Sequence, residues 1–442
     1  MTDLQRNPHF LSWPHKAAAT PVTALSVERL SHAARFLLDC PPNADVVVLE
    51  SADAVTPYMD TIDALAASST DSNPLFEAAT LAAAMTHLQS GGPVRVALVW
   101  SEPSNDGTRI LLGAFPYQMR RGYLGLPLRV WTIWTHIHGF LATPLVRAGH
   151  ERAAIRRFLR FADQSSAPLM RFPLFEADGA FGPALADVLG ERALPFVETG
   201  RRERALPFVE TGRHERAFLK SDLDGDAYLA VHMRKKKRKE YNRQWNRFAE
   251  MGDLKFEAND GGELDGWLER FFWLERSGWK GKRGTALAER PNERAFFEAM
   301  CRDARTANKF HAAQITLDGK PVAMLASFVA GGGAYSFKIA YDEAYARFSP
   351  GAQLMMRVIG AFHDDPRISW VDSCAIPNHP MIDHIWAERR AIREVNAATS
   401  HRLSAHLVAY SARATHLAER GWSFARAVYH RLRRKVEHEQ AH

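Results

Sequence analysis

Residues 341–356 read YDEAYARFSPGAQLMM, which places a proline and a glycine between an acidic, aromatic loop and an apolar helical pattern. Ser349 suits the N-cap of that helix, Pro350 its first position, and Gly351 lets another group approach the backbone closely. A helix that begins in this way offers free N–H groups and a positive dipole end, which bind phosphate well. Capping alone would produce the same residues, so the stretch predicts a helix start, with a phosphate site as a hypothesis.

The residues around this stretch alternate between strand-like and helix-like patterns. Three strands are expected within 310–341, joined by Asp318-Gly319 and by the glycines at 331–333. A strand over 368–374, a helix over 378–390 and a last strand follow. Upstream, 226–252 predicts one continuous helix, 73–90 predicts another, and 94–134 holds three strand-like runs. The alternation indicates an α+β protein with mixed sheets.

Length and composition narrow the class of protein. The chain has 442 residues, of which 46% are hydrophobic and 24% charged, as in a globular protein of two or three domains. Cys40, Cys301 and Cys374 are far apart and have no metal-ligand spacing, so free thiols, no metal and a reducing cytoplasm are expected. The N-terminus does not resemble a signal peptide, and the apolar window at 130–146 is too short and too interrupted to span a bilayer.

The positive charge of the chain is concentrated in one segment. The net charge is +7, and the segment from Arg234 to Arg247 reads RKKKRKEYNRQWNR. A solvated helical face would explain this run of charges. Contact with an anionic partner, whether CoA, nucleic acid or a membrane surface, would explain it as well.

An internal repeat lies near the middle of the chain. ERALPFVETGRR at 191–202 is followed by ERALPFVETGRH at 203–214, which indicates a local tandem duplication, with the surplus copy bulging from the surface. The expected organisation is an N-terminal extension (1–69), a first domain (70–185), a linker with the duplication (186–225), a second domain (226–398) and a basic helical tail (399–442).

Three segments in order carry a resemblance to a known family. RSGWKGKRGTAL at 276–287, KIAYDEAYARFSPGAQL at 338–354 and the strand with Asp372 resemble the CelD/BcsL-type acetyltransferases of the GNAT superfamily. SNPLFEAATL in the first half is similar to the same family, so the resemblance spans about residues 70–395. It implies two GNAT-like domains in tandem, as in Fem-type aminoacyl transferases, each a mixed, mostly antiparallel twisted sheet flanked by helices.

The resemblance implies acyl-CoA as co-substrate, with pantetheine along the strand at 334–340 and pyrophosphate at the helix start. The superfamily's phosphate loop reads Arg/Gln-x-x-Gly-x-Gly/Ala, and here a proline stands where the first glycine belongs. The expected cofactor-binding residues are Ile339, Ala340, Arg347, Ser349, Gly351 and Ala352.

Candidates for proton transfer and for acceptor binding follow from the same comparison. Asp342, Asp372 and His379 are the candidate catalytic residues, with Asp383 and His384 nearby, and each has a structural explanation as well. The tyrosine that the superfamily often places on the last helix is missing between 376 and 390. The expected acceptor-binding residues are Trp279, Lys280, Arg283 and Tyr341.

The expected function is an acyl-CoA-dependent N- or O-acyltransferase, such as an acetyltransferase, with direct attack on the thioester. The acceptor would be a sugar, an amino acid or a precursor of the cell envelope or of polysaccharide biosynthesis. One alternative is aminoacyl transfer from charged tRNA, with phosphate contacts from Arg234 to Arg247. Another is a non-catalytic GNAT fold that binds an anionic partner.

Overall fold

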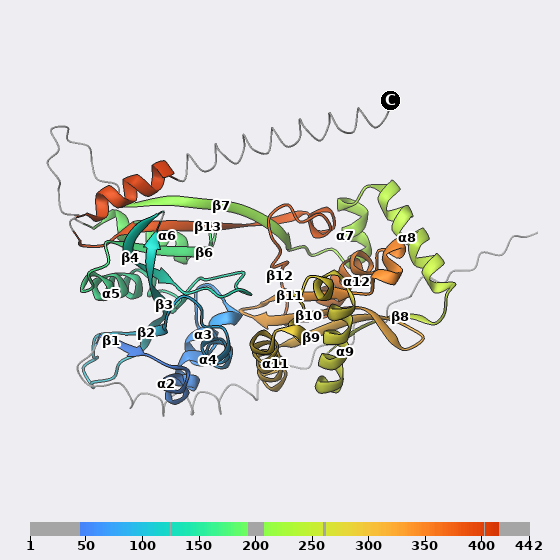
Figure 1. Ribbon diagram of the computed structural model, residues 1–442, viewed down its shortest axis with the longest axis horizontal. Coiled ribbons are helices and arrows are strands. Elements are labelled where there is room, and N and C mark those ends of the chain that lie inside the picture. The colour runs from blue at the N-terminus through green and yellow to red at the C-terminus, as the bar shows by residue number, and fades with distance from the viewer. Residues whose placement is uncertain (1–44, 124, 193–206, 260–261, 402, 415–442) are drawn as a thin grey trace, which may run out of the picture. The chain divides into compact units, whose positions relative to one another are not determined.

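The computed structural model describes residues 45–123, 125–192, 207–259, 262–401 and 403–414 (Figure 1). Within these residues the strands form one continuous sheet of 13 strands. The order along the sheet is β1-β2-β3-β4-β6-β13-β7-β12-β11-β10-β9-β8, and β5 pairs with β3 outside this path. The protein is therefore α+β, with a large mixed sheet flanked by helices, as expected.

The sheet consists of two halves with the same order of strands. The first half contributes β1 (Val46–Leu49), β2 (Val94–Trp100), β3 (Leu111–Tyr123), β4 (Leu126–Ile133), β5 (Leu145–Val146) and β6 (Leu169–Glu176). The second half contributes β8 (Leu254–Asn259), β9 (Phe310–Leu317), β10 (Lys320–Ala330), β11 (Gly333–Tyr341) and β12 (Val371–Asp372). In each half a series of antiparallel strands ends in one parallel pair, β4 with β6 and β11 with β12.

The halves exchange their last strands. β7 (Phe208–Leu219) follows the first half in sequence but pairs with β12, and β13 (Glu388–Ala398) follows the second half but pairs with β6. β7 and β13 pair with each other in antiparallel fashion along most of their length. The exchange joins the two halves into one sheet through backbone hydrogen bonds.

Helices flank the sheet in both halves. The first half has α2 (Ala52–Val55), α3 (Met59–Ala67), α4 (Ala78–His87), α5 (Glu151–Asp163) and α6 (Phe181–Gly190), with η2 (Thr56–Tyr58) and η3 (Pro74–Phe76). The second half has α7 (Gly225–His232), α8 (Lys235–Ala249), α9 (Leu264–Ser277), α10 (Trp279–Lys282), α11 (Pro291–Thr306) and α12 (Pro350–Asp364), with η4 (Leu287–Glu289), η5 (Glu343–Phe348) and η6 (Ile382–His384). Residues 404–414 are also helical. None of the described helices is long and apolar enough to cross a bilayer.

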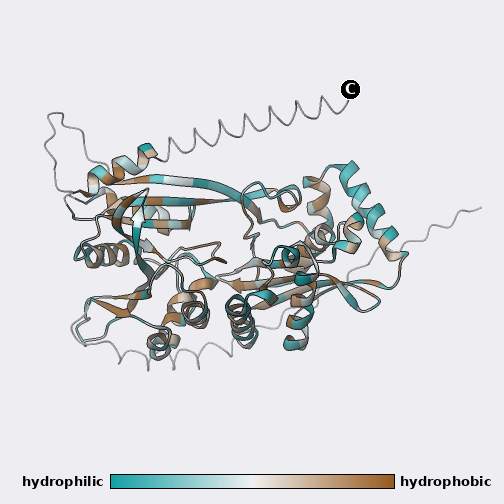
Figure 2. Cartoon of the chain, viewed as in Figure 1, coloured by the Kyte–Doolittle hydropathy of each residue, from teal (hydrophilic) through white to brown (hydrophobic). Residues whose placement is uncertain are grey.

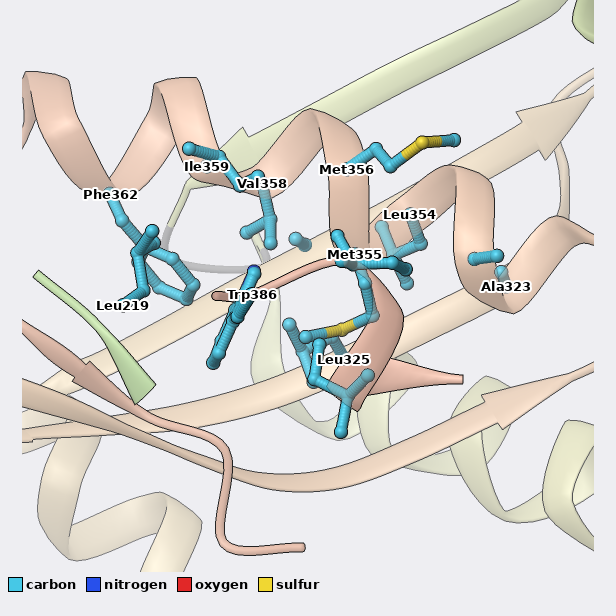
Figure 3. Packing of buried hydrophobic residues seen from close by; sticks show 14 of the residues in the cluster. Leu219, Ala323, Leu325, Leu354, Met355, Met356, Val358, Ile359, Phe362 and Trp386 are labelled. Carbon is cyan, nitrogen blue, oxygen red and sulfur yellow. The ribbon is translucent and has the colours of Figure 1, made fainter. Parts of the chain in front are cut away.

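The core of the second half lies between α12 and the sheet. Apolar residues recur at helical spacing along α12, and their side chains are buried with Leu325 of β10 and Trp386 (Figure 3). Each such side chain contributes about 1.5 to 3 kcal/mol of transfer free energy on burial. The stripe consists of Leu354, Met355, Val358, Ile359 and Phe362. This packing fixes the start of α12 against the end of β11.

Two expected domain boundaries differ from the structure. Residues 46–67 belong to the first half rather than to an extension, because β1 pairs with β2 and α3 buries Ile62 and Leu65. The interval expected as a linker, 186–225, contains all of β7. The second repeat copy enters β7 from Phe208 and pairs there with β13, so the bulge expected of one surplus copy could concern only the first copy. Residues 193–206, which hold most of the first copy, lie outside the described residues.

Three expected elements are also corrected. The helix over 226–252 is interrupted at Met233, whose backbone is extended (φ -109, ψ 130) while its side chain is buried in the core. The helix over 378–390 reduces to η6, because Asn378 is left-handed (φ 57) and Pro380 lacks an N–H donor. The strand over 368–374 reduces to β12, since Cys374 turns the chain with φ 51. Of the expected tail, 415–442 lies outside the described residues.

Candidate active site

The end of β11 has one open edge. β11 pairs with β12 only at Ala334 and Tyr335, and β12 ends at Asp372 while β11 continues to Tyr341. Among the described residues, no strand pairs with this edge from Ser336 to Tyr341. The expected donor residues Ile339 and Ala340 lie in this part of β11. Ala340 pairs with Met324 of β10, and the carbonyl oxygen of Ile339 lies 3.5 Å from Nζ of Lys280. The free edge of a strand suits an extended amide ligand.

A β-bulge marks the place where the two strands separate. In the ladder of β10 and β11, Ser336 faces Ser327 and Lys338 faces Ala326, so Phe337 is the additional residue. A bulge bends the strand and redirects the side chains beyond it. Here it precedes Lys338, whose side chain lies near residues of α9 and α11.

The helix after β11 begins at Pro350, as expected, but Ser349 does not cap it. Ser349 is left-handed (φ 54, ψ 50) and its side chain makes no capping hydrogen bond, because this conformation turns it away from the first N–H groups. The first turn of α12 contains no acidic residue. The leading N–H groups of a helix have no intrahelical acceptor, so this end suits an anion.

Gly351 and Ala352 are buried in this first turn. A Cβ atom on Gly351 would lie 3.3 Å from Cδ1 of Tyr341 and 3.5 Å from the Met381 sulfur. Glycine therefore allows the tyrosine at the end of β11 to pack directly against the helix start. The two elements expected to bind the donor are in contact through this residue.

Arg347 lies on η5, directly before the start of α12. Its side chain is exposed, its guanidinium lies 4.7 Å from the centre of the Phe348 ring, and Nη2 is 3.7 Å from the Met251 sulfur. Within the described part of the chain, no carboxylate forms an ion pair with it. Its charge is available to an anionic ligand.

The basic helix α8 packs beside η5. The Phe248 ring stacks on the Phe348 ring at 4.7 Å and 9°. The opposite side of α8 is hydrophilic (Figure 2), and it exposes Lys235, Lys236, Lys237, Lys239, Arg243 and Arg247. α8 therefore lies beside η5 and the start of α12, with its positive surface on the side away from Phe348.

The glycine-rich loop expected to bind the acceptor contacts the end of β11. The backbone N–H of Trp279 donates to Oε1 of Glu343 at 2.7 Å, and Nζ of Lys282 lies 2.7 Å from Oε2 of the same carboxylate. The Arg283 guanidinium lies 5.1 Å from the centre of the exposed Trp279 ring. Nζ of Lys280 donates to the buried carboxylate of Glu275 at 2.6 Å. The predicted acceptor residues Trp279, Lys280 and Arg283 thus lie in one loop, and Tyr341 lies beside its start, because a Cβ atom on Gly278 would lie 3.8 Å from the Tyr341 carbonyl oxygen.

Sequence reasoning missed a polar group behind the bulge. Nζ of Lys338 lies 3.1 Å from Nδ1 of His138, which belongs to the segment between β4 and β5 of the first half. Nε2 of His138 lies 2.9 Å from Oε2 of Glu293 on α11. Arg290 donates to the other oxygen of Glu293 at 2.8 Å. The lysine within the apolar pattern AYSFKIA was the one signal in the sequence for this group.

The charges of this group follow from its surroundings. Burial, together with the nearby Lys280 cation, lowers the pKa of Lys338 to about 8. Burial and the Lys338 cation lower the pKa of His138 to about 2, so its ring is neutral. Burial also lowers the pKa of His136 to about 4. Lys338 is thus a cation at neutral pH whose protonation responds to small changes around it.

Two of the three candidate catalytic residues have structural roles as turn caps. Oδ1 of Asp342 accepts from the N–H of Ala344 at 2.9 Å and caps η5. Nδ1 of His379 accepts from the N–H groups of Met381 at 3.3 Å and Ile382 at 3.4 Å, and burial lowers the pKa of His379. Asp383 and His384 follow in η6, and His384 is exposed.

Asp372 is fully buried between two arginines. Its Oδ2 accepts from Arg216 of β7 at 2.6 Å and from Arg390 of β13 at 2.9 Å. Burial alone would raise the pKa of Asp372, but the two guanidinium groups outweigh it and hold the pKa below its ordinary value. A carboxylate held ionised in this way is a poor proton acceptor, and its two ion pairs give Asp372 a structural role between β7, β12 and β13. Burial raises the pKa of the neighbouring Cys374 thiol well above its ordinary value, which leaves it unreactive.

The geometry combines an open strand edge, a helix start free of acids and a buried cation next to the bulge. Among the described residues, no group of three or more His, Cys, Asp or Glu side chains is placed to hold a metal ion. Residues 235–379 match the protein family described as an acetyltransferase (GNAT) domain. The chain therefore contains a GNAT acetyltransferase domain and is an acyltransferase by class.

Several solved structures are similar to this chain at low sequence identity. FemX is 12% identical, with a TM-score of 0.50, over 77% of this chain and 96% of that one. A tandem GNAT protein from the clavulanic acid biosynthesis pathway is 13% identical, with a TM-score of 0.36, over 80% of this chain and 98% of that one. The C-terminal domain of a lysylphosphatidylglycerol synthetase of Agrobacterium fabrum, designated putative, is 11% identical, with a TM-score of 0.46, over 81% and 96%. No curated protein sequence matches the chain. The likeness to FemX concerns the fold.

Proposed function

We propose that the protein transfers an acyl group, such as acetyl, from acyl-CoA to an amine or hydroxyl of a sugar, an amino acid or a cell-envelope precursor, like a CelD/BcsL-type acetyltransferase. The observation that carries this proposal is the open edge of β11, from Ser336 to Tyr341, which leads directly to the start of α12. An extended pantetheine amide and a pyrophosphate require these two features in this order.

The donor would lie along the edge with its pyrophosphate at Gly351 and Ala352. Backbone N–H groups and the helix dipole supply the attraction, and Arg347 adds an unpaired charge. The missing first glycine of the phosphate loop is compatible with this arrangement, because Pro350 occupies the first helical position, where an N–H has no intrahelical partner.

The acceptor would enter from the side of α9 and α11, next to Trp279 and Lys280. Its nucleophile attacks the thioester carbon, and the carbonyl oxygen becomes an oxyanion that the Lys338 ammonium stabilises. The C–S bond then breaks, and the CoA thiolate takes the proton that the acceptor loses. Nε2 of His136 is buried and has no hydrogen-bond partner among the described residues, so it is available to a polar group of the acceptor.

Calorimetric titration of CoA tests the donor site. Arg347→Glu places an anion beside the pyrophosphate and should weaken CoA binding at least about tenfold. Arg270→Glu on α9 is the control, since it makes the same charge change at an exposed residue away from α12 and should leave the affinity unchanged. Equal affinity in both variants, or no CoA binding by the wild type, would overturn the donor assignment.

Turnover with a panel of amines and hydroxylated acceptors tests the chemistry. Lys338→Met keeps the length of the side chain and removes its charge, so kcat should fall by about 10² to 10³, as when an oxyanion donor is lost. CoA affinity should stay within about twofold, because Lys338 lies away from the phosphate end. Full turnover in this variant would remove Lys338 from the mechanism.

A second candidate function is aminoacyl transfer from charged tRNA, and the position of α8 favours it. The C-terminal end of α8 packs on η5 through Phe248, and the exposed lysines of the same helix would meet phosphates of a tRNA whose charged end reaches the strand edge. The affinity for tRNA should then fall steeply between about 50 and 200 mM salt, and Lys235→Gln with Lys236→Gln should reduce this slope. Absence of tRNA binding at low salt would dismiss this candidate and leave the acyl-CoA reaction unaffected.

A further inference from the structure

A segment of the first half forms one wall of the site in the second half. The ring of His138 stacks on Phe296 of α11 at 6.1 Å and 9°, and meets the edge of Phe337 at 6.3 Å. His136 contacts the same Phe296 ring at 5.1 Å. These aromatic contacts hold the imidazole of His138 at a fixed orientation beside Lys338.

The contacts of His138 determine its tautomer. A lysine ammonium has only donors, so Nδ1 of His138 accepts from Nζ of Lys338. The neutral ring then carries its proton on Nε2, the atom that lies 2.9 Å from the Glu293 carboxylate. Nε2 of His138 makes no hydrogen bond among the described residues, so its contact with the Glu293 carboxylate is electrostatic, whereas Nδ1 contacts the ammonium directly.

We propose that His138 and Glu293 are positioning residues for Lys338. The negative charge of Glu293 favours the His138 tautomer that carries its proton on Nε2. Nδ1 of His138 then holds one proton of the ammonium, so that the remaining two point toward the thioester carbonyl beside the bulge at Phe337. This inference rests on the oxyanion role of Lys338 in the proposed function. It also explains why the catalytic half requires the first half: the acceptor for Lys338 comes from another domain.

The charged groups around Lys338 come from several elements. Glu275 of α9 and Glu293 of α11 favour its ammonium form, whereas burial and Lys280 of α10 disfavour it. Arg290 lies beyond Glu293 and neutralises part of its charge. Loss of the His138 acceptor removes a hydrogen bond that only the charged lysine needs, so the pKa of Lys338 should fall further.

Two substitutions of His138 separate its role from simple packing. His138→Phe keeps the ring between Phe296 and Phe337 but removes both nitrogens. His138→Asn places an amide oxygen at the δ position, where it can still accept from Lys338. We expect kcat to fall about 10- to 100-fold in the Phe variant with an unchanged KM for acyl-CoA, and to recover in part in the Asn variant.

The pH profile gives a readout that a structural role would not move. The lysine ammonium is lost as pH rises through its pKa, so kcat of the wild type should decline above about pH 8. His138→Phe should shift this decline to lower pH, and Glu293→Gln should shift it in the same direction by less. An unchanged decline in both variants would overturn the proposal.

A second measurement does not depend on activity. The side-chain signal of Lys338 in protein labelled with 13C at lysine Cε, assigned through Lys338→Arg, reports its titration directly. A wild-type pKa near the ordinary 10.4, or one unchanged in His138→Phe, would refute positioning even if acyl transfer proceeds. A shifted pKa without any acyl transfer would instead refute the proposed function and keep the contact.

Discussion

The two halves share one order of strands and differ where their parallel strands separate. In the first half, β4 pairs with β6 from Val130 to Thr132 and ends at the next residue. In the second half, β11 continues from its last pair at Tyr335 to Tyr341 with a free edge. The same topology therefore yields a closed pair in one half and an open groove edge in the other.

The helices α5 and α12, which follow β5 and β11 in the two halves, differ in whether their first turn contains an acidic residue. The first turn of α5 contains Glu151, whose Oε1 accepts from the N–H of Gly149 at 2.9 Å, whereas the first turn of α12 contains no acid. The helix start of the first half is thus occupied by its own carboxylate. The first half supplies His136 and His138, which contact Phe296 and Lys338 of the second half.

The symmetry between the halves is retained where they exchange strands. Arg216 of β7 and Arg390 of β13 lie directly opposite each other in the ladder. Asp372 at the end of β12 pairs with both guanidinium groups, and Glu176 at the end of β6 pairs with Arg390. Two like charges in register repel, so the acids at the strand ends make the exchange possible.

The largest expected effect on stability comes from Asp372→Asn. The Asp372 and Arg216 side chains are 0% and 2% exposed, so the variant leaves two buried cations facing each other without their shared anion. Such a loss costs about 3 to 5 kcal/mol of the free energy of unfolding. Urea unfolding curves of the variant and the wild type measure it.

Glu176→Gln is the matched substitution in the other half and should cost less, about 1 to 3 kcal/mol, because Glu176 contacts one arginine and its side chain is 18% exposed. Burial, only partly offset by Arg390, raises the pKa of Glu176, whereas that of Asp372 is lowered. If both variants lost the same free energy of unfolding, the ion pairs of Asp372 and Glu176 would contribute equally to stability, and this prediction would be wrong.

A substitution at Gly331 tests a second contact between the halves. It is left-handed (φ +55), and a Cβ atom there would lie 2.3 Å from Cβ of Ser72 in the first half. Gly331→Ala should destabilise the fold by about 1 to 3 kcal/mol through strain and overpacking. Gly319→Ala is the control: it has φ +76 in the turn between β9 and β10 with nothing within 4 Å, so only the backbone term of about 1 kcal/mol applies. Similar melting midpoints for the two variants would mean that Ser72 moves aside freely.

Much of this fold was accessible from the sequence because local patterns determine it. The Asp318-Gly319 turn, the three strands around it and the helix start at Pro350 all follow from residues adjacent in the chain. The strand exchange could not be predicted from the sequence. No local feature of the repeat motif in β7 indicates that this strand pairs with β12 and β13. The helix expected over 378–390 failed because Asn378 and Pro380 outweigh the apolar spacing.

The functional site stays a prediction, and only part of its geometry follows from residues adjacent in the chain. The loop residues Trp279 and Lys280 and the donor residues around Gly351 are close in sequence to the motifs that suggested them. The ion pairs of Asp372 were not accessible from the sequence, because Arg216 lies 156 residues away along the chain. His138 lies 200 residues from Lys338, so only tertiary structure relates them. Sequence motifs therefore predict where a loop lies, but they do not predict which charged side chains from distant parts of the chain contact it.

The smallest effect is expected at Glu151, which distinguishes the two helix starts. Backbone N–H groups, outweighing its burial, lower the pKa of Glu151, so its contribution is present above its unfolded pKa of about 4.3 and is lost as pH falls through the folded value. Glu151→Gln should therefore cost about 0.5 kcal/mol at pH 7, and the difference from the wild type should vanish near pH 3 in urea titrations. CoA affinity should be unchanged, because the closed pair of β4 and β6 leaves no edge for pantetheine beside α5. A gain of a second CoA equivalent in this variant would show that the carboxylate alone, rather than the closed strand pair, keeps the first half from binding a donor.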